Sequence, residues 1–266
     1  MLKDALVLKL KALAKKYETS AFLCDDPSQF MHRYSTVPDM EAAAFIAASL
    51  SFGKRELFIS KLNLVFSDID EKCPGASPVC RWLLGGRYKE IFPKSKKKFY
   101  RFFSYADLNA LCGRLAEIIR QHGSLGAAVR LQKERLESAA EGGGLQKNAA
   151  ELLPVRSLIS LFPGIKCVSQ NAEGACKKLH MFLRWMVRRN SPVDLGLWTW
   201  LLPDALLIPL DVHVLKESER LGLLPEGSKA SAKTAVLLTK TAAQIWPKDP
   251  ARADFALFGL GVSKER

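Results

Sequence analysis

The sequence of 266 residues lacks the cysteine and histidine spacings that hold metal ions. Its six cysteines are scattered without a Cys-x-x-Cys pair, and its four histidines include no His-x-x-x-His pair. Zinc and iron–sulfur sites are built on such pairs, so we expect neither a metal nor a cofactor. Buried, reduced thiols are the expected state of the cysteines.

Long apolar runs are also missing. The densest apolar stretch, residues 42–52, is far shorter than the ~20 residues that a membrane-spanning helix requires. Residues 1–20 place leucine and valine three and four positions apart with lysines between them, which predicts an amphipathic helix and not a signal peptide. We therefore expect a cytoplasmic protein with no membrane partner.

Acidic residues are few relative to basic ones. There are 27 Asp and Glu against 40 Lys and Arg, which gives a formal net charge of +13 and a pI near 9.5. Such an excess favours a polyanionic partner, nucleic acid or an anionic membrane surface, over an acidic protein substrate. A basic protein that its charge merely keeps soluble is the alternative. The hydrophobic fraction of 48% excludes a disordered chain.

Strand signals are sparse, and apolar residues recur with the helical period, which predicts an all-α fold. Asp39 is the expected N-cap of one helix. A glycine run at 142–144 is expected to be a flexible break and not a phosphate-binding loop, because no strand precedes it and no Gly-Lys-Ser/Thr follows. The expected helices cover residues 38–50, 54–70, 105–122, 125–136, 149–161, 174–189, 212–221, 231–245 and 250–260.

One segment is both basic and aromatic. Residues 87–101 carry seven cations and one anion, with Tyr88, Phe92, Phe99 and Tyr100 between them. Cations neutralise phosphates and aromatic faces stack on bases, so this composition suits nucleic acid. A solvated lysine loop whose aromatic residues face the core is the alternative.

A second basic segment, residues 174–189, is predicted to form a helix with two different faces. At 100° per residue, the apolar face holds Leu179, Phe182, Leu183 and Met186, and the opposite stripe holds Lys177, Met181, Arg184 and Arg188. Lys177 lies in the first turn, where a cation opposes the helix dipole. This placement disfavours the ammonium form and favours a nucleophilic amine. An exposed lysine on a solvated helix face is the alternative.

Asp211 follows the apolar run 206–210 and precedes a predicted helix. An aspartate at such a position is commonly an N-cap. Because the apolar run is expected to be buried, the same carboxylate can also lie at the floor of a cleft. The two roles do not exclude each other, since the amide hydrogen bonds of a cap keep a carboxylate ionised and oriented.

Lys177 and the Asp211 segment together resemble the helix–hairpin–helix (HhH-GPD) DNA glycosylase superfamily, which includes endonuclease III and the 8-oxoguanine glycosylases. Leu210–Val214 followed by Glu219–Leu223 is similar to its aspartate segment, Lys177 occupies the position of its catalytic lysine, and residues 41–51 resemble its first barrel helix. Within the superfamily the sequence resembles most an uncharacterised bacterial family, a domain of unknown function. The motifs of that family are matched by Phe182–Arg188, Asp194–Trp198 and Asp254–Gly261, and the match runs from about Arg33 to the end.

The resemblance implies a two-lobe helical fold with a cleft between the lobes. A helical barrel lobe covers residues 38–190 and includes the hairpin, and a second lobe of residues 1–37 and 191–266 carries the aspartate segment. The hairpin is degenerate, since Glu173 and Ala175 stand where the superfamily has glycines. Archaeal 8-oxoguanine glycosylases, to which the sequence is also similar, have an altered hairpin as well.

The resemblance further implies a base-excision repair enzyme that removes a damaged base, such as an oxidised purine, from double-stranded DNA. The expected protein is a monomer associated with the nucleoid. The damaged nucleotide is flipped into the cleft, and Lys177 attacks its sugar to form a Schiff base that permits β-elimination, the AP lyase reaction. Asp211 stabilises the positive charge that develops on the sugar.

Other site residues follow from the same resemblance. Lys178, Arg184 and Arg188 are expected to contact phosphates or brace the site. Ser51, Phe52 and Lys54 are expected to meet DNA, with Phe52 as a wedge, and a buried aromatic residue at a helix end is the alternative for Phe52. Trp185, Trp198 and Trp200 are candidates for stacking on the flipped base, and buried core positions are the alternative. Two other functions remain open from the sequence: a catalytically inactive DNA-binding protein of the same fold, and an RNA-directed factor.

Overall fold

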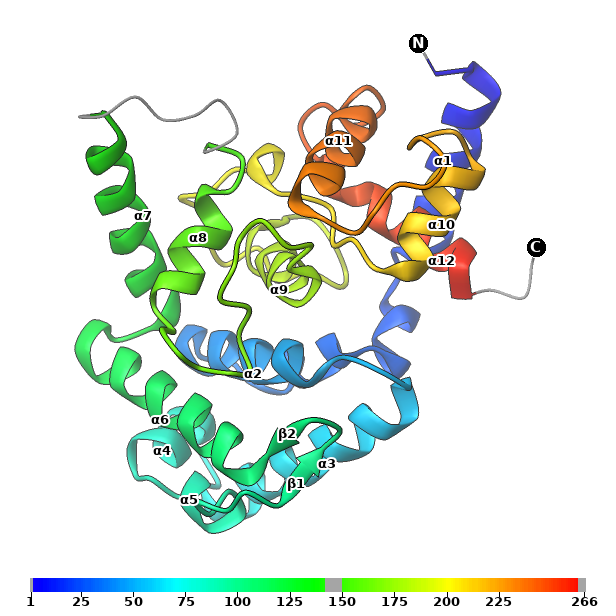
Figure 1. Cartoon of the computed structure of the whole chain (residues 1–266). Helices are drawn as coiled ribbons and strands as arrows, with labels where there is room; N and C mark the ends of the chain where they lie inside the picture. The colour runs from blue at the N-terminus through cyan, green and yellow to red at the C-terminus, as the bar shows by residue number, and fades with distance from the viewer. Residues whose placement is uncertain (1, 142–149, 263–266) are drawn as a thin grey trace. The chain divides into compact units, whose positions relative to one another are not determined.

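The structure, a computed structural model, describes residues 2–141 and 150–262, and it is predominantly helical (Figure 1). The all-α prediction is confirmed. The helices are α1 (Asp4–Tyr17), α2 (Val37–Leu50), α3 (Arg55–Lys72), α4 (Pro78–Leu84), α5 (Tyr88–Ile91), α6 (Tyr105–His122), α7 (Leu125–Glu141), α8 (Leu153–Ser160), α9 (Lys177–Val187), α10 (Val212–Arg220), α11 (Ala232–Ala243) and α12 (Ala253–Val262). Short 3₁₀ turns cover Ser20–Asp25, Pro27–Arg33, Pro203–Ala205 and Pro250–Arg252, and two short strands, β1 (Lys98–Tyr100) and β2 (Phe103–Ser104), form a hairpin.

Local signals explain where some of these helices begin and end. α6 coincides with its prediction because Ser104 and Asp107 form a capping box at its start and Gly123, with φ 78°, ends it. The predicted N-cap role of Asp39 is wrong. Thr36 precedes α2, and the Asp39 carboxylate instead accepts a hydrogen bond of 2.7 Å from the Cys80 amide in the first turn of α4. The predicted break at residues 142–144 lies outside the described residues.

The chain divides into two compact units, and each is considered by itself. The α9–α12 unit comprises Met1–Phe22, Leu145–Val155 and Asn171–Arg266, and the α2–α7 unit comprises Leu23–Gly144 and Arg156–Gln170. Lys177 and Asp211 both belong to the α9–α12 unit.

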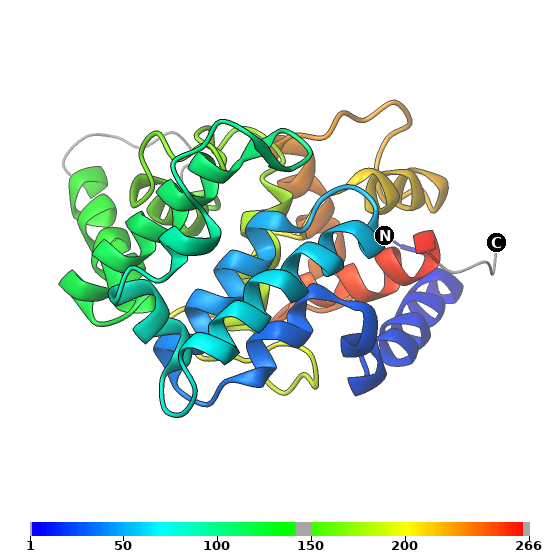
Figure 2. The ribbon, with the colours of Figure 1, turned by 90° about the horizontal axis from the view of Figure 1, so that it is seen from below.

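In the α9–α12 unit, α12 packs against both α1 and α10 (Figures 1 and 2). Two glycines allow this close approach. A Cβ at Gly259 would lie 2.1 Å from the Tyr17 ring of α1, and a Cβ at Gly261 would lie 2.7 Å from the His213 Cβ of α10. α12 is therefore the element against which α10, and with it Asp211, is positioned.

In the α2–α7 unit, α2 is buried along most of its length, from Glu41 to Leu50. Phe45 stacks on Phe162 with ring centroids 4.6 Å apart. The buried Glu41 carboxylate accepts a hydrogen bond of 2.8 Å from the Gly126 amide, at the start of α7, where a negative charge is favourable. The apolar run around residues 42–52 is thus a core helix. Within the described part of the chain, no helix has the length and apolar character needed to cross a membrane.

Candidate active site

The structure brings Lys177 and Asp211 together. The Lys177 Nζ lies 3.8 Å from the Asp211 Oδ2, and their side chains are 30% and 21% exposed. Both residues stand at helix starts, since Lys177 is the first residue of α9 and Asp211 is the N-cap of α10. A half-buried amine beside a half-buried carboxylate is accessible to a substrate and only partly screened by water.

Asp211 is oriented by the chain on both sides of it. The run Leu206–Leu210 is buried, and the Ile208 amide donates a hydrogen bond of 3.0 Å to the Thr239 hydroxyl of α11. The Asp211 Oδ1 then accepts hydrogen bonds of 2.9 Å from the amides of His213 and Val214. Because Oδ1 serves the cap, Oδ2 is the oxygen that faces Lys177. One oxygen of Asp211 therefore caps α10, and the other is available to interact with Lys177.

Lys177 follows a residue with an unusual backbone conformation. Cys176 has φ 41° and ψ 33°, the left-handed region that residues other than glycine rarely adopt. The preceding segment is tied down, because Gly174 bridges to Ser231 and the Ala232 amide donates to the Glu173 carbonyl at 3.0 Å. No acidic residue stands in the first turn of α9. Local strain of this kind is concentrated at functional sites.

Arg184 and Arg188 are not on a solvated stripe. Their side chains are only 4% and 2% exposed, and carboxylates from distant parts of the sequence surround them. A helical wheel shows which residues share a side of a helix, and it does not show whether that side is exposed or buried. The buried contacts of the two arginines support a bracing role and not contact with phosphates.

The arginines and their partners form a buried ion cluster within one unit. Arg184 pairs with Asp194 at 3.2 Å and with Asp254. Arg188 pairs with Asp194, with Asp249 at 2.8 Å and with Glu18 at 2.7 Å. Burial opposes the charge of Arg188, but the hydrogen bond to Asp249 and the surrounding carboxylates outweigh it and raise its pKa. The ion cluster joins α9 to α1, to the start of α12 and to the loop after α9.

The loop after α9, residues 190–203, closes on the end of that helix. The Leu195 amide donates to the Trp185 carbonyl and the Trp198 amide to the Met186 carbonyl, both at 2.8 Å. These bonds satisfy carbonyls that the last turn of a helix leaves open. Trp185 and Trp198 are buried, as the core alternative expected, whereas Trp200 is partly exposed and stacks on Trp198 at 5.2 Å.

Sequence reasoning missed Asp254 as a site residue. It belonged to the closing motif of the resemblance, yet nothing in the motif indicated a role. Burial raises the pKa of Asp254 to about 6, against the lowering effect of Arg184. The charges of Asp211 and Lys177 also act on it, in opposite directions. Asp254 is therefore a member of the ion cluster through Arg184, and the charges of Lys177 and Asp211 also act on its pKa.

His180, one turn after Lys177, is expected to make stability pH-dependent. It is 2% exposed, neither ring nitrogen finds a hydrogen-bond partner among the described residues, and burial lowers the pKa of His180 to about 4. The unfolded chain takes up this proton near pH 6.5. The contribution of His180 to stability is therefore lost as the pH falls from about 6.5 to about 4, and it amounts to roughly 3 kcal/mol.

The measurement is the free energy of unfolding of His180→Leu and of the wild type in urea from pH 7 to pH 4. Asp254 acts in the same window with the opposite sign, because its buried carboxyl takes up a proton near pH 6 and thereby relieves a cost of folding. The difference between the two proteins isolates His180, and we expect it to move in favour of the variant as the pH falls. A difference that stays constant contradicts a buried, neutral ring.

Ser51, Phe52 and Lys54 belong to the other unit, at the end of α2 and the start of α3. Ser51 is buried and its hydroxyl donates a hydrogen bond of 2.6 Å to the Ala47 carbonyl. Phe52 is partly exposed and lies within a group of aromatic rings, and Lys54 is exposed. Of the three, Lys54 presents a charge to solvent.

The basic segment 87–101 divides by residue type. Its aromatic residues Tyr88, Phe92, Phe99 and Tyr100 are all buried, as the core alternative expected. Its lysines at 94, 96, 97 and 98 are exposed. Sequence reasoning missed Phe102, which directly follows the segment and is 53% exposed at the turn of the β1–β2 hairpin.

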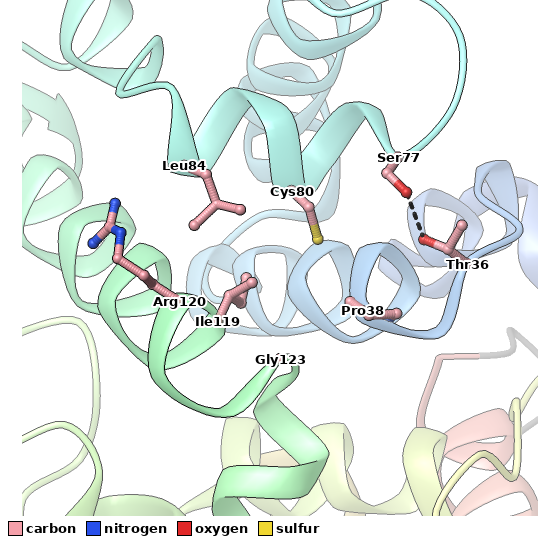
Figure 3. Close-up of a pocket in the computed structure, with 8 residues that line it drawn as sticks. All are labelled: Thr36, Pro38, Ser77, Cys80, Leu84, Ile119, Arg120 and Gly123. Carbon is pink, nitrogen blue, oxygen red and sulfur yellow. Dashed lines mark hydrogen bonds between the residues drawn. The ribbon is translucent and has the colours of Figure 1, made fainter.

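The α2–α7 unit also contains a cavity of about 540 Å³. Its walls come from the start of α2, from α4 and from the end of α6 (Figure 3). The lining residues are Thr36, Pro38, Ser77, Cys80, Leu84, Ile119, Arg120 and Gly123. Burial raises the pKa of the Cys80 thiol, so this cysteine is a poor nucleophile. The cavity holds no paired lysine and carboxylate, and in the described ranges no three acidic, histidine or cysteine side chains could hold a metal ion.

The chain belongs to a family described as protein of unknown function (DUF2400), whose model matches residues 26–263. No curated protein and no solved structure matches it. The prediction of an uncharacterised family is confirmed. Membership of the helix–hairpin–helix glycosylase superfamily stays a prediction.

Proposed function

We propose that this protein is a DNA base-excision repair glycosylase with AP lyase activity, acting on a damaged base such as an oxidised purine. The observation that carries the proposal is the pair formed by Lys177 and Asp211, with Nζ and Oδ2 3.8 Å apart. The proposal includes the two-lobe fold of the superfamily that the sequence resembles and a monomer bound to double-stranded DNA. The net charge of +13 supports a polyanionic partner.

The chemistry assigns one role to each residue of the pair. The neutral Lys177 amine attacks C1′ of the flipped nucleotide, and the base leaves with the electron pair of the glycosidic bond and is protonated. The C1′–O4′ bond then opens with its electron pair on O4′, which takes up a proton from solvent, and a protonated Schiff base remains. The iminium acidifies C2′, so that loss of a C2′ proton expels the 3′ phosphate by β-elimination. Asp211 stabilises the positive charge on the sugar during base departure.

The surroundings of the pair support this assignment. Cys176, in the left-handed region, directly precedes Lys177, and the first turn of α9 contains no acidic residue, so the Asp211 carboxylate is the anion beside the Lys177 amine. The buried ion pairs of Arg184 and Arg188 fix α9 to neighbouring segments of the same unit. Lys178 and Lys54 remain candidates for phosphate contacts, whereas Arg184 and Arg188 brace the site.

Borohydride trapping is the test of the proposal. We expect a covalent protein–DNA adduct on at least one duplex carrying 8-oxoguanine, uracil, 3-methyladenine or an abasic site, because borohydride reduces the Schiff base. Lys177→Ala removes the only amine that the mechanism uses and is expected to abolish the adduct. Lys216→Ala, which removes an exposed lysine of α10, is the matched control and is expected to trap like the wild type.

Two results contradict the mechanism: no adduct on any duplex, or an adduct that persists in Lys177→Ala. A catalytically inactive DNA-binding protein of the same fold is the second candidate. It is favoured by the departures at Glu173 and Ala175, where the superfamily has glycines. Salt-dependent binding to every duplex without trapping would support it.

A further inference from the structure

The β1–β2 hairpin of the α2–α7 unit has a tight, strained turn. Lys98 pairs with Ser104 and Tyr100 with Phe103, so Arg101 and Phe102 form the turn. Arg101 has φ 49°, in the left-handed region where a residue with a side chain is uncommon. Strain of this kind persists only where the surrounding structure imposes it, and it is concentrated at functional sites.

The turn presents an aromatic ring to solvent. Phe102 is 53% exposed, although the neighbouring Phe99 and Phe103 are buried. Its ring stacks on Phe52, with centroids 4.8 Å apart and planes 27° apart, and meets the edge of Phe103 at 4.7 Å. Phe52 therefore lies beneath an outer ring and supports it.

The exposed ring is held in place by its backbone. The ammonium groups of Lys98 and Lys166 each donate a hydrogen bond of 3.2 Å to the Phe102 carbonyl. The Tyr100 hydroxyl donates to the Phe52 carbonyl and so connects the hairpin to the end of α2. A side chain fixed in this way loses little conformational entropy when it binds a partner.

Cations predominate around the hairpin turn: the ammonium groups of Lys98 and Lys166 lie at the Phe102 carbonyl, and Lys166 also pairs with Asp107 at 3.2 Å. Residues 94–104 include four lysines and Arg101 and no acidic residue. The lysines at 94, 96, 97 and 98, Arg101 and Lys54 are exposed. A rigid aromatic face among cations matches the composition of surfaces that stack on nucleobases and neutralise phosphates. A membrane contact uses a broader apolar face than one ring.

We infer that Phe102, supported by Phe52, is a stacking site for an unstacked base of DNA, and that the surrounding cations contact the adjoining phosphates. The inference deepens the proposed function and rests on it for the choice of DNA as the partner. It changes the role expected for Phe52, which becomes the support of the contact, while Phe102 becomes the residue that meets the base.

The test is the affinity for a fluorescein-labelled duplex that contains one tetrahydrofuran abasic-site analogue, measured by anisotropy. We expect Phe102→Ala to weaken binding to this duplex by about tenfold or more, as the loss of one base–aromatic stack predicts. Phe102→Trp keeps an aromatic face and is expected to bind like the wild type. Binding to the same duplex without the analogue is expected to change less, because its bases remain stacked.

The matched control is Leu131→Ala, which shortens an exposed apolar side chain on α7 and is expected to leave the affinity unchanged. Melting temperatures establish that each variant is folded. Equal affinity of Phe102→Ala and the wild type for both duplexes overturns the inference. So does a loss of binding by Phe102→Ala that is confined to vesicles of phosphatidylglycerol, since that result identifies a membrane contact.

The analogue separates this inference from the proposed function. It has no aldehyde, so Lys177 cannot form a Schiff base with it. A Phe102-dependent affinity without borohydride trapping supports the stacking site and contradicts the lyase mechanism. Borohydride trapping together with an affinity that does not depend on Phe102 supports the lyase mechanism and contradicts the stacking site.

Discussion

Replacing Arg188 with methionine is expected to lower the free energy of unfolding by about 3–5 kcal/mol, the usual cost of removing one partner from a buried ion pair. Arg188 is 2% exposed and pairs with carboxylates of Asp194, Asp249 and Glu18. Its removal leaves these carboxylates facing one another in a poorly solvated region. Methionine fills much of the same volume, so the expected loss is mainly electrostatic.

The measurement is urea unfolding at pH 7 and at pH 5. Burial already raises the pKa of Asp194 and of Asp254, so both carboxyls accept protons more readily than exposed ones do. Without Arg188 this tendency increases, because Arg188 is one of the charges that lower the pKa of Asp194. We therefore expect part of the lost stability to return at pH 5.

Arg189→Met is the matched control, because the neighbouring Arg189 is exposed and donates a hydrogen bond of 2.7 Å to the Thr199 carbonyl. One such bond contributes about 1 kcal/mol. If Arg188→Met unfolds no more easily than Arg189→Met, the ion cluster does not stabilise the fold.

The ion cluster also marks what could not be predicted from the sequence. The helix at 174–189 was expected from its period, and α9 lies within that range. The burial of Arg184 and Arg188 could not be predicted, because it depends on four carboxylates that come from residues 18, 194, 249 and 254. A helical wheel contains no information on such distant partners, so a buried stripe and a DNA-facing stripe look the same.

Local chemistry was more informative. Ser104 and Asp107 have the spacing of a capping box, and α6 begins where that spacing requires. Asp39 shows the limit of the same reasoning, because its carboxylate caps α4, forty-one residues away, and not the helix that contains it. The β1–β2 hairpin was missed because strands of three and two residues are too short to show an alternating pattern.

The Lys177–Asp211 pair was predicted only through the resemblance, since neither residue type is rare at a helix start. The structure adds the distance from Lys177 Nζ to Asp211 Oδ2, 3.8 Å. It also shows that Oδ1 of Asp211 caps α10 while Oδ2 faces Lys177. It also adds Asp254 as a site residue, whose pKa is raised by burial and lowered by Arg184. Burial and long-range pairing are outcomes of folding and are not written in a local motif.

Asp211→Asn is expected to separate the structural from the chemical role of that residue. Asparagine caps helices about as well as aspartate, so its side-chain oxygen keeps the hydrogen bonds to His213 and Val214 and stability changes by less than about 1 kcal/mol. The negative charge that faces Lys177 is lost. Under the proposed mechanism we expect the rate of borohydride trapping to fall by about 10²–10³-fold, the usual effect of removing one group that stabilises a transition-state charge.

Asp211→Ala and Asp204→Asn complete the comparison. Alanine removes both the cap and the charge, and we expect it to lose about 0.5–2 kcal/mol of stability in addition to the trapping rate. Asp204 is an exposed carboxylate shortly before Asp211 in the chain, and its neutralisation is expected to leave both stability and rate unchanged. If Asp211→Asn traps as fast as the wild type, the carboxylate at this position serves only to cap α10. In that case the electrostatic part of the proposed mechanism belongs to another residue, and Asp254, which lies in the field of Lys177, is the next to be tested.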